Sequence, residues 1–295
     1  MNPPWLVLLN GSAGRRPLDP GRVERALEDA GVEADLEMPE TAEEMGARIA
    51  GAAREERWRL GVVGGDGTVN LAINQMLPLA WSTRPLLSVL PSGTGCDLLR
   101  TFGIPQVLEQ AARHLAGDGS YAIDIGRLEG DWGTRYFANV AQAGVGAAAA
   151  ESAPALGRGW GRARYPLAFL RRLPGFPPAQ TRIDLGDRVH EGPALAVIFA
   201  NAQFFAGGWN VAPRALLNDG RLDVQVINCK KPEAVRLVPK IIKGLHLTDP
   251  AVRRYSSPGF TLATSLPWPV EADGDLVGNT PVKVSVLPGA LDLKI

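Results

Sequence analysis

A glycine-rich segment that directly follows a short apolar run constrains this chain more than any other feature. The run Leu60 to Val63 is typical of a buried strand, and the residues from Thr68 onward can begin a helix. A glycine turn at a helix N-terminus presents backbone N–H groups and the positive end of the helix dipole, which suits a phosphate. The sequence therefore predicts an α/β unit with a phosphate site at a strand end. The segment consists of Gly64, Gly65, Asp66, Gly67, Thr68, Val69 and Asn70.

The aspartate in this segment separates it from the common phosphate loops. The segment lacks the GK[ST] ending of a P-loop, and its glycine spacing is not G-x-G-x-x-G. Asp66 would repel a phosphate unless a cation lay between them. The pattern therefore predicts a nucleotide whose phosphates are bridged by a metal ion.

Strand-like and helix-like segments alternate through the first third of the chain. Strands are expected at 5–9, 60–63 and 86–90, and helical periodicity follows Arg22, Thr41 and Pro105. Residues 41–44 have the capping-box pattern, with Thr41 as the N-cap. The alternation predicts a parallel sheet with helices on both faces, which binds ligands outside the carboxyl ends of its strands. A second glycine loop at 91–97 also follows a strand, so we expect both loops at one site.

The pattern of apolar residues changes from about Tyr121. Helical periodicity thins, and short β-like runs appear at 135–140, 194–200, 222–227 and 282–287, separated by turn residues that include Pro288-Gly289. This pattern predicts an all-β, mostly antiparallel sandwich or barrel-like second domain. We expect domains at 1–122 and 123–295, with no linker to mark the boundary.

Charge and cysteine content exclude several classes of protein. Lys+Arg and Asp+Glu balance at 31 each, which gives no case for a nucleic-acid partner. Two cysteines indicate a reducing compartment without a disulfide framework. The chain shows no signal peptide and no stretch of 18 apolar residues, so we expect a cytoplasmic protein. The three histidines lack zinc-ligand spacing.

Four motifs in this order resemble the diacylglycerol kinase catalytic family, and more narrowly the soluble bacterial lipid kinases, which are relatives of the sphingosine kinases. The motifs are 64–70, 91–97, 213–224 and Asp273-Gly274. The resemblance implies an ATP-binding α/β domain, a β-sandwich domain, and Mg-dependent phosphorylation of a hydroxyl of diacylglycerol or a similar lipid. The GGDGT stretch also occurs in NAD kinases, so an NAD-kinase-like enzyme stays an alternative, which the sandwich motifs disfavour.

The resemblance also implies site residues in the first domain. The loop at 64–70 would surround the ATP phosphates, with further nucleotide contacts at Thr94 and Thr41; for Thr41 the alternative is a helix N-cap alone. The acids around the catalytic Mg²⁺ would be Asp66, Asp97 and Asp124. The alternatives are a helix-terminal acid for Asp97 and a turn or strand-end aspartate for Asp124.

In the second domain the resemblance implies a general base and a second metal site. Asp273 would accept the proton of the lipid hydroxyl, although Asp-Gly is also a common hairpin turn. A structural Mg²⁺ would bind the Asp219 carboxylate and the backbone carbonyls of Leu216 and Arg221. Without the resemblance, residues 218–220 read as a hairpin turn.

Three positions depart from the family pattern. Leu71 and Asp275 stand where the family commonly has glutamate, and Cys96 stands where it has asparagine. These departures keep a second hypothesis open, in which the protein is a non-catalytic regulator that binds a nucleotide or a lipid. The proposed base and all three magnesium aspartates are present, so we expect activity.

A basic, aromatic segment at 158–176 fits a lipid substrate. It carries five arginines, four aromatic residues and no acid. Such a segment can rest on an anionic membrane surface, which would be the inner membrane face. The alternative is a helix that packs its apolar face in the core. The sequence does not name the lipid, and it leaves the oligomeric state open, with a homodimer among the alternatives.

Overall fold

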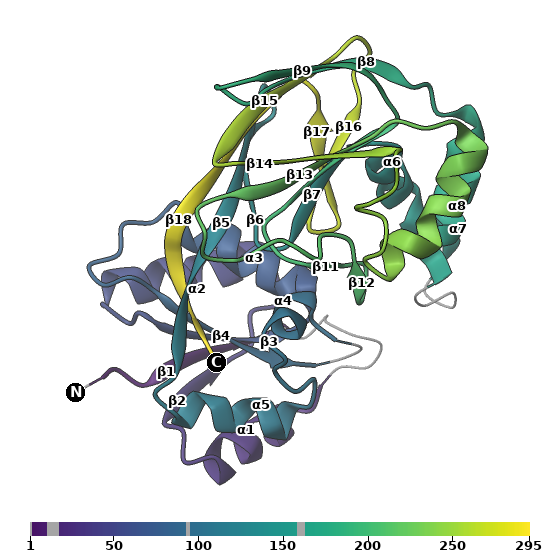
Figure 1. Cartoon of the computed structure of the whole chain (residues 1–295). Coiled ribbons are helices and arrows are strands. Elements are labelled where there is room, and N and C mark those ends of the chain that lie inside the picture. Colours follow the sequence, from purple (N-terminus) through teal and green to yellow (C-terminus); the bar gives the residue numbers. More distant parts are fainter. Residues whose placement is uncertain (1, 11–17, 93–94, 158–162) are drawn as a thin grey trace. The chain divides into compact units, whose positions relative to one another are not determined.

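The computed structural model describes residues 2–10, 18–92, 95–157 and 163–295, and the chain forms two compact units (Figure 1). Unit 1 comprises Met1–Asp124 and Pro288–Ile295, and unit 2 comprises Ile125–Leu287. Two strands, β5 (Ser120–Gly130) and β18 (Val282–Lys294), contribute residues to both units. The division therefore falls within strands, and no linker separates the units.

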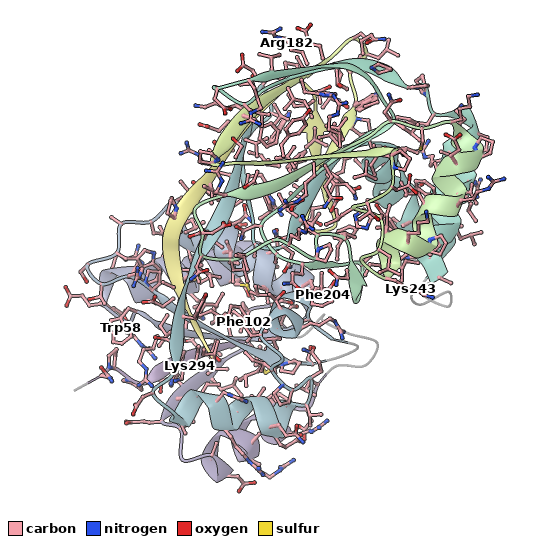
Figure 2. The ribbon with its side chains drawn as sticks, in the orientation of Figure 1. Trp58, Phe102, Arg182, Phe204, Lys243 and Lys294 are labelled. Carbon is pink, nitrogen blue, oxygen red and sulfur yellow. The ribbon has the colours of Figure 1, made fainter. Side chains whose placement is uncertain are left out.

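The C-terminal residues 288–295 belong to unit 1, whereas the sequence pattern predicted them in the second domain. The expected turn at Pro288-Gly289 lies inside β18, which continues as one strand. Lys294 holds this end in unit 1: its side chain is buried, and its Nζ donates to the carbonyl oxygens of Gly117 at 2.5 Å and Gly119 at 2.9 Å (Figure 2).

Unit 1 is built on a parallel sheet, as predicted. Its strand order is β2-β1-β3-β4-β18, and each neighbouring pair runs parallel. Every residue of β1 is buried, because both faces of such a sheet are covered and its strands are continuous apolar runs. The strands introduced here are β1 (Trp5–Leu9), β2 (Ala34–Glu37), β3 (Arg59–Gly64) and β4 (Leu86–Pro91).

Helices cover the sheet of unit 1 on both faces (Figure 1). Helices α1 and α5 pack on each other and share a core with Trp5, Val7 and Leu9, which alternate along β1 and so point to one face. Helices α2 and α3 pack on each other at the opposite face. The helices are α1 (Pro20–Asp29), α2 (Ala42–Arg54), α3 (Asp66–Met76), the short α4 (Asp97–Thr101) and α5 (Leu108–Ala116).

Unit 2 is a β-sandwich, which confirms the predicted architecture. One layer is a six-stranded sheet in the order β14-β13-β10-β7-β16-β17, and its pairs run antiparallel. These strands are β7 (Val140–Gly144), β10 (Ala196–Ala200), β13 (Leu222–Ile227), β14 (Val252–Ser257), β16 (Pro269–Ala272) and β17 (Asp275–Asn279).

The other layer comprises the first part of β18 with β15, β8 and β9, together with the β5–β6 hairpin. Phe199 of the first layer packs edge-to-face on Phe137 and Phe260 of this layer, with ring centroids 6.2 Å and 5.5 Å apart. The core of unit 2 therefore lies between the two sheets. The strands added here are β6 (Gly133–Phe137), β8 (Ala179–Asp184), β9 (Val189–Ala194) and β15 (Gly259–Thr264).

Three α-helices accompany the sandwich within the described residues of unit 2, and the sequence pattern indicated only one of them, as an alternative for 158–176. They are α6 (Val145–Ser152), α7 (Arg164–Arg172) and α8 (Lys231–Ile242). Helix α6 gives no amphipathic signal because its first five residues, 145–149, are all buried. Helix α8 does place Ala234 and Leu237 on a buried face, but its prolines, at 232 and 239, obscure the pattern.

Candidate active site

The strand order of unit 1 reverses between β1 and β3, and doubly wound sheets bind their ligands at such a reversal. Asn10 directly follows β1. Its backbone N–H donates to the Val63 carbonyl oxygen at 3.3 Å, and its side-chain Nδ2 donates to Thr68 Oγ1 at 3.1 Å. The end of β1 and the beginning of α3 are therefore joined at the edge of the sheet where the glycine loop lies.

The glycine loop has the close packing that its sequence predicts. A Cβ atom at Gly64 would lie 2.3 Å from Thr68 Oγ1, so only glycine fits there. Gly65 is the N-cap of α3, which begins at Asp66. A Cβ at Gly67 would meet nothing within 4 Å, so the first turn of α3 leaves open space beside its backbone. This arrangement suits a phosphate, because a helix N-terminus attracts anions.

The second glycine loop contacts the first. Ser92 donates its N–H to the Gly64 carbonyl oxygen at 3.2 Å, and a Cβ at Gly65 would lie 3.8 Å from the Gly95 carbonyl oxygen. The backbone N–H of Asp97 donates to Asp66 Oδ1 at 2.6 Å. The structure thus brings the two loops together in unit 1. Thr94, a predicted nucleotide contact, lies outside the described residues.

Two of the three predicted magnesium aspartates are neighbours. Asp66 and Asp97 each begin a helix, and Asp97 is buried with Arg100 Nε 3.4 Å from its Oδ1, so the helix-terminal interpretation of Asp97 also holds. Asp124 is buried within β5 and accepts the Gly289 N–H at 2.8 Å. Across the described parts of the chain, no three Asp, Glu, His or Cys side chains form a group that could hold a metal ion.

Mg²⁺ usually keeps several waters, so neighbouring carboxylates fit it without three direct ligands. The donor set of Asp66 and Asp97 at two helix N-termini is therefore chemically suited to a hydrated hard cation. The assignment of all three aspartates to magnesium stays a prediction.

The remaining predicted nucleotide residues have structural roles. Thr41 is the N-cap of α2, and its Oγ1 accepts the Glu44 N–H at 3.1 Å. The expected capping box is incomplete, because Glu44 Oε2 accepts the N–H of Glu40 at 2.7 Å. The side chains of Val69 and Asn70 are buried in α3. Nucleotide contacts at these three positions stay predictions.

The three departures from the family pattern have different surroundings. Cys96 is buried, and its burial, together with the charge of Asp66, raises the pKa of its thiol well above the usual value, which removes it as a nucleophile. Leu71 is half-buried on α3. Asp275 forms an ion pair with Arg135 at 2.7 Å.

Asp273 lies in a tight turn that fixes its carboxylate. The turn joins β16 to β17, and positive φ angles at Asp273 (47°) and Gly274 (98°) fit a two-residue hairpin. Its Oδ2 accepts the Ala138 N–H at 2.8 Å, and its Oδ1 accepts the N–H groups of Asn139 and Val140, each at 3.0 Å. The hairpin interpretation is therefore correct, and the same contacts orient the proposed base.

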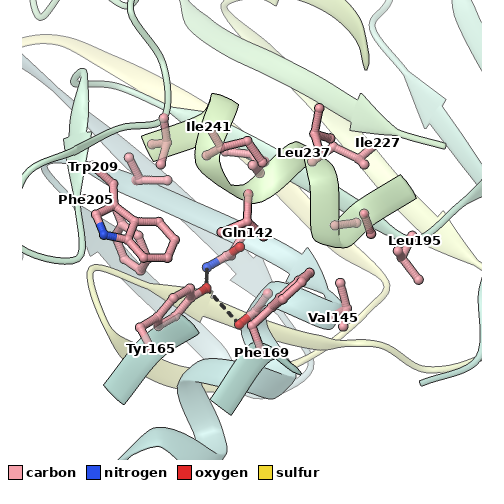
Figure 3. Close-up of a pocket in the computed structure, with 17 residues that line it drawn as sticks. Gln142, Val145, Tyr165, Phe169, Leu195, Phe205, Trp209, Ile227, Leu237 and Ile241 are labelled. Atoms are coloured by element: carbon pink, nitrogen blue, oxygen red, sulfur yellow. Dashed lines mark hydrogen bonds between the residues drawn. The ribbon is translucent and has the colours of Figure 1, made fainter. Parts of the chain in front are cut away.

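Unit 2 also contains an apolar pocket (Figure 3). Residues of β7, β10, α6, α7 and α8 line it, and Gln142 is the one amide side chain among the described residues that do so. Val140 also lines the pocket, and its backbone N–H is a donor to Asp273. Labelled wall residues in Figure 3 include Val145, Tyr165, Phe169, Leu195, Leu237 and Ile241.

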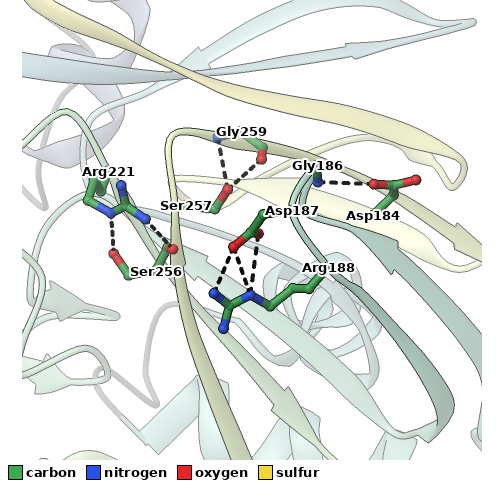
Figure 4. A network of polar contacts seen from close by, with 8 residues as sticks. All are labelled: Asp184, Gly186, Asp187, Arg188, Arg221, Ser256, Ser257 and Gly259. Atoms are coloured by element: carbon green, nitrogen blue, oxygen red, sulfur yellow. Dashed lines mark hydrogen bonds and ion pairs between the residues drawn. The ribbon is translucent and has the colours of Figure 1, made fainter.

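The segment proposed for a second metal ion forms a turn. Asp219 Oδ1 accepts the N–H of Arg221 at 3.0 Å, and Gly220 has a φ of +66°. The Arg221 side chain donates to Ser256, at 2.8 Å to Oγ and 2.7 Å to the carbonyl oxygen (Figure 4). Leu216 is exposed. The metal assignment stays a prediction.

Comparisons with known proteins define the class of the chain. Residues 4–128 match the family described as the diacylglycerol kinase catalytic domain, and residues 139–295 match the YegS C-terminal NAD kinase beta sandwich-like domain. The chain therefore belongs to the diacylglycerol kinase family and carries the C-terminal domain of YegS-type proteins. The predicted resemblance is confirmed, and this membership supports the activity of a lipid kinase.

Individual relatives agree over most of the chain. A diacylglycerol kinase of Mycobacterium tuberculosis is 33% identical over 238 residues, which cover 79% of this chain and 75% of that protein. A diacylglycerol kinase of Bacillus subtilis is 26% identical over 280 residues, covering 93% and 90%. The solved structure of a diacylglycerol kinase from Bacillus anthracis has a TM-score of 0.74 at 19% identity and covers 99% and 96% of the two chains, which confirms the fold.

Proposed function

We propose that this protein is an ATP-dependent lipid kinase, which transfers the γ-phosphate to a hydroxyl of diacylglycerol or a similar lipid. One observation beyond family membership carries the proposal. Val140 lines the apolar pocket and donates its N–H to the carboxylate of Asp273. An apolar pocket beside a fixed carboxylate suits a molecule with an apolar body and a hydroxyl group to be deprotonated.

In the proposed mechanism Asp273 accepts the proton of the lipid hydroxyl. The oxygen of that hydroxyl attacks the γ-phosphorus, the bond from the γ-phosphorus to the bridging oxygen breaks, and ADP leaves. Three backbone N–H groups hold the carboxylate in one orientation, so little reorganisation is needed when the hydroxyl approaches. The reaction requires the glycine loop of unit 1 to bind the phosphates while unit 2 binds the lipid.

Magnesium would be held by Asp66 and Asp97, with Asp124, and it would neutralise phosphate charge during transfer. The N-terminus of α3 supplies N–H groups and the positive helix dipole to the same phosphates. In unit 2 the Asp219 carboxylate and the carbonyls of Leu216 and Arg221 would hold a second, structural Mg²⁺. These assignments are part of the proposal.

We also propose that the segment 158–176 touches an anionic membrane surface through α7; residues 158–162 lie outside the described residues. Tyr165 and Phe169 pack against the core of unit 2, so the aromatic part of this segment serves the fold. Leu170 is 45% exposed, and Arg171 and Arg172 are exposed as well, with Arg172 paired to Glu151. These three residues form the surface of α7 available to lipid. None of the helices in the described residues is long and apolar enough to cross a membrane.

A labelled-phosphate assay tests the proposed function. The protein is incubated with γ-labelled ATP and Mg²⁺ and offered diacylglycerol, sphingosine, other hydroxyl lipids, or NAD. Labelling of a lipid supports the proposal and names the acceptor. Labelling of NAD would instead support an NAD kinase. Tight ATP binding without transfer, unrestored by Leu71→Glu and Cys96→Asn, would support a non-catalytic regulator.

A further inference from the structure

A chain of buried polar side chains crosses the apolar interior of unit 2. Glu271 of β16 pairs in register with Gln142 of β7, and both side chains are buried. Gln142 Nε2 donates to Glu271 Oε2 at 2.8 Å. It also donates to the Tyr165 hydroxyl at 2.7 Å (Figure 3). The Tyr165 hydroxyl donates to the Gly146 carbonyl oxygen at 2.9 Å. Each member therefore has a fixed partner.

The two ends of this hydrogen-bonded row of side chains contact the two parts of the proposed lipid site, which are the turn that carries the base and the apolar pocket. At one end, Glu271 Oε1 accepts the backbone N–H of Gly274, the residue after the proposed base Asp273. At the other end, Gln142 and Tyr165 line the apolar pocket. The path from pocket to turn thus runs through three side chains on β7, α7 and β16.

The fold alone does not account for an acid at this position. A buried carboxyl group is costly, and an apolar residue of similar volume would often be neutral or stabilising. The surroundings nevertheless make room for the network, because a Cβ at Gly146 would lie 1.9 Å from Gln142 Oε1. The phosphoryl transfer described above makes no use of Glu271.

We infer that Glu271 is a positioning residue for the Asp273–Gly274 turn, and that Gln142 and Tyr165 couple the occupant of the apolar pocket to that turn. The inference rests on the proposed function for its consequence in catalysis. A lipid chain that packs against the ring of Tyr165 restrains the Tyr165 hydroxyl, which accepts a hydrogen bond from Gln142. Gln142 then holds Glu271, and Glu271 holds the Gly274 N–H, so the turn that carries the base opens less often when the acceptor is bound.

Charges around Glu271 make the coupling sensitive to pH. Asp273 and Asp275 lie on its own hairpin, Arg135 of β6 pairs with Asp275, and Tyr165 faces it from α7. Helix α6, which also packs on β16, carries the acid Glu151, which pairs with Arg172. Burial, with the charges of Asp273 and Asp275, raises the pKa of Glu271 to about 8.

The ionised form of Glu271 accepts stronger, charge-assisted hydrogen bonds from Gly274 and Gln142. The rate of transfer should therefore rise as pH increases through about 8. Burial and the charge of Glu271 raise the pKa of Tyr165, so its hydroxyl stays protonated through this range.

Exchange of the Gly274 amide hydrogen, followed by NMR, tests the positioning role without any assay of activity. Glu271→Leu removes the acceptor of this N–H, and we expect exchange to accelerate at least about tenfold relative to the parent. Glu271→Gln keeps an acceptor oxygen, so its exchange should stay within about threefold of the parent. Unchanged exchange in Glu271→Leu would overturn the inference.

Gly146→Ala provides a second variant that leaves Glu271 and Tyr165 intact. The new methyl group displaces the amide of Gln142, and we expect faster Gly274 exchange in this variant as well. Parent-like exchange in a folded Gly146→Ala protein would show that the Gln142 link has no role.

Occupancy of the pocket is tested with 1,2-dioctanoylglycerol, with its binding measured by calorimetry. In the parent, the probe should slow Gly274 exchange. Tyr165→Phe should bind the probe and lose this effect, because only the hydroxyl link is removed. Phe169→Leu, a pocket residue outside the polar chain, is the control: it should weaken binding without changing exchange in the free protein. A full probe effect in Tyr165→Phe would overturn the coupling.

Kinetics with the acceptor found in the lipid panel complete the test. Glu271→Leu should lower kcat with little change in the KM for ATP, and Glu271→Gln should restore much of kcat while removing the rise near pH 8. A parent-like pH profile in Glu271→Gln would contradict the inference. Absence of any phosphate transfer would refute the proposed function and leave the exchange results to decide this inference.

Discussion

The backbone N–H of Asp97 donates to the carboxylate of Asp66 across 2.6 Å, which joins the two glycine loops of unit 1. Asp66 begins α3 and Asp97 begins α4, so the two carboxylates lie where two helix dipoles are positive. This contact explains why an aspartate can stand within a phosphate loop. Asp66 Oδ1 has a structural partner in the Asp97 N–H, and we propose that the charge of this carboxylate faces a cation.

Replacing Asp66 by asparagine should separate these two roles. Asparagine keeps an oxygen that can accept the Asp97 N–H, so the free energy of unfolding should change by less than about 1 kcal/mol. The lost charge should reduce phosphoryl transfer about 10²- to 10³-fold and raise the Mg²⁺ concentration needed. Transfer rates across a Mg²⁺ titration measure both effects. Asp19→Asn, at the exposed N-cap of α1, is the control, and an unchanged titration curve in Asp66→Asn would refute the metal assignment.

Two alanine substitutions in the glycine loop should have opposite signatures. At Gly64 a Cβ would lie 2.3 Å from Thr68 Oγ1, so Gly64→Ala should lower the free energy of unfolding by about 1–3 kcal/mol. A Cβ at Gly67 would meet nothing within 4 Å, so the free energy of unfolding of Gly67→Ala should stay close to that of the parent. The added methyl group should obstruct the phosphates and raise the KM for ATP. Denaturant unfolding and ATP kinetics measure the pair. A parent-like KM in Gly67→Ala would argue against phosphates at this loop.

Much of the fold could be predicted because its signals are local. The strands at 5–9 and 86–90 are continuous apolar runs, which is what a sheet buried on both faces requires. Helix α6 could not be predicted, because its first five residues are all buried and show no alternation of apolar and polar faces. The place of residues 288–295 was also hidden, since Pro288-Gly289 has a turn composition but lies within β18.

The candidate site also has a part that the sequence predicts and a part that it does not. The glycine loops could be predicted, because each brings its own strand end, glycines and helix start within a few residues. The pocket and its polar chain could not, since Gln142, Tyr165 and Glu271 come from three separate elements. Only the fold makes them neighbours. A weak signal was present in Gly146, a glycine inside an alanine-rich helix.

Asp273→Asn tests the proposed base. Asparagine tolerates the left-handed backbone of this position, but its amide would face backbone N–H groups, so stability should fall by about 1–3 kcal/mol. Transfer should fall about 10²- to 10⁴-fold while ATP binding persists. Single-turnover transfer and ATP affinity, measured on folded protein, separate the two effects. Asp275→Asn is the matched control on the same hairpin, and equal losses in both variants would argue against Asp273 as the base.

Arg171→Gln tests contact between α7 and a membrane surface. An exposed arginine near anionic lipid contributes about 1 kcal/mol, so the variant should bind vesicles containing phosphatidylglycerol about fivefold more weakly. Salt should weaken binding of the parent more than that of the variant. Cosedimentation measures the partition. The control is Arg182→Gln, which replaces an exposed arginine of β8 that pairs with Glu191. If Arg182→Gln loses binding and Arg171→Gln does not, α7 is not the membrane contact.

Glu271 should give unit 2 a stability that declines with pH. In the unfolded chain this carboxyl titrates near 4.5, whereas burial raises its pKa in the folded protein to about 8. Between these values the folded state keeps a proton that the unfolded state releases, so the free energy of unfolding should fall by up to about 1.4 kcal/mol per pH unit. Below 4.5 and above 8 both states carry the same charge at this position, and its contribution becomes flat. Glu271→Gln should remove the slope, whereas Glu191→Gln, at an exposed site, should leave it unchanged. Urea midpoints from pH 5 to pH 9 measure the difference, and parallel curves for Glu271→Gln and the parent would show that Glu271 is ionised in the folded protein throughout.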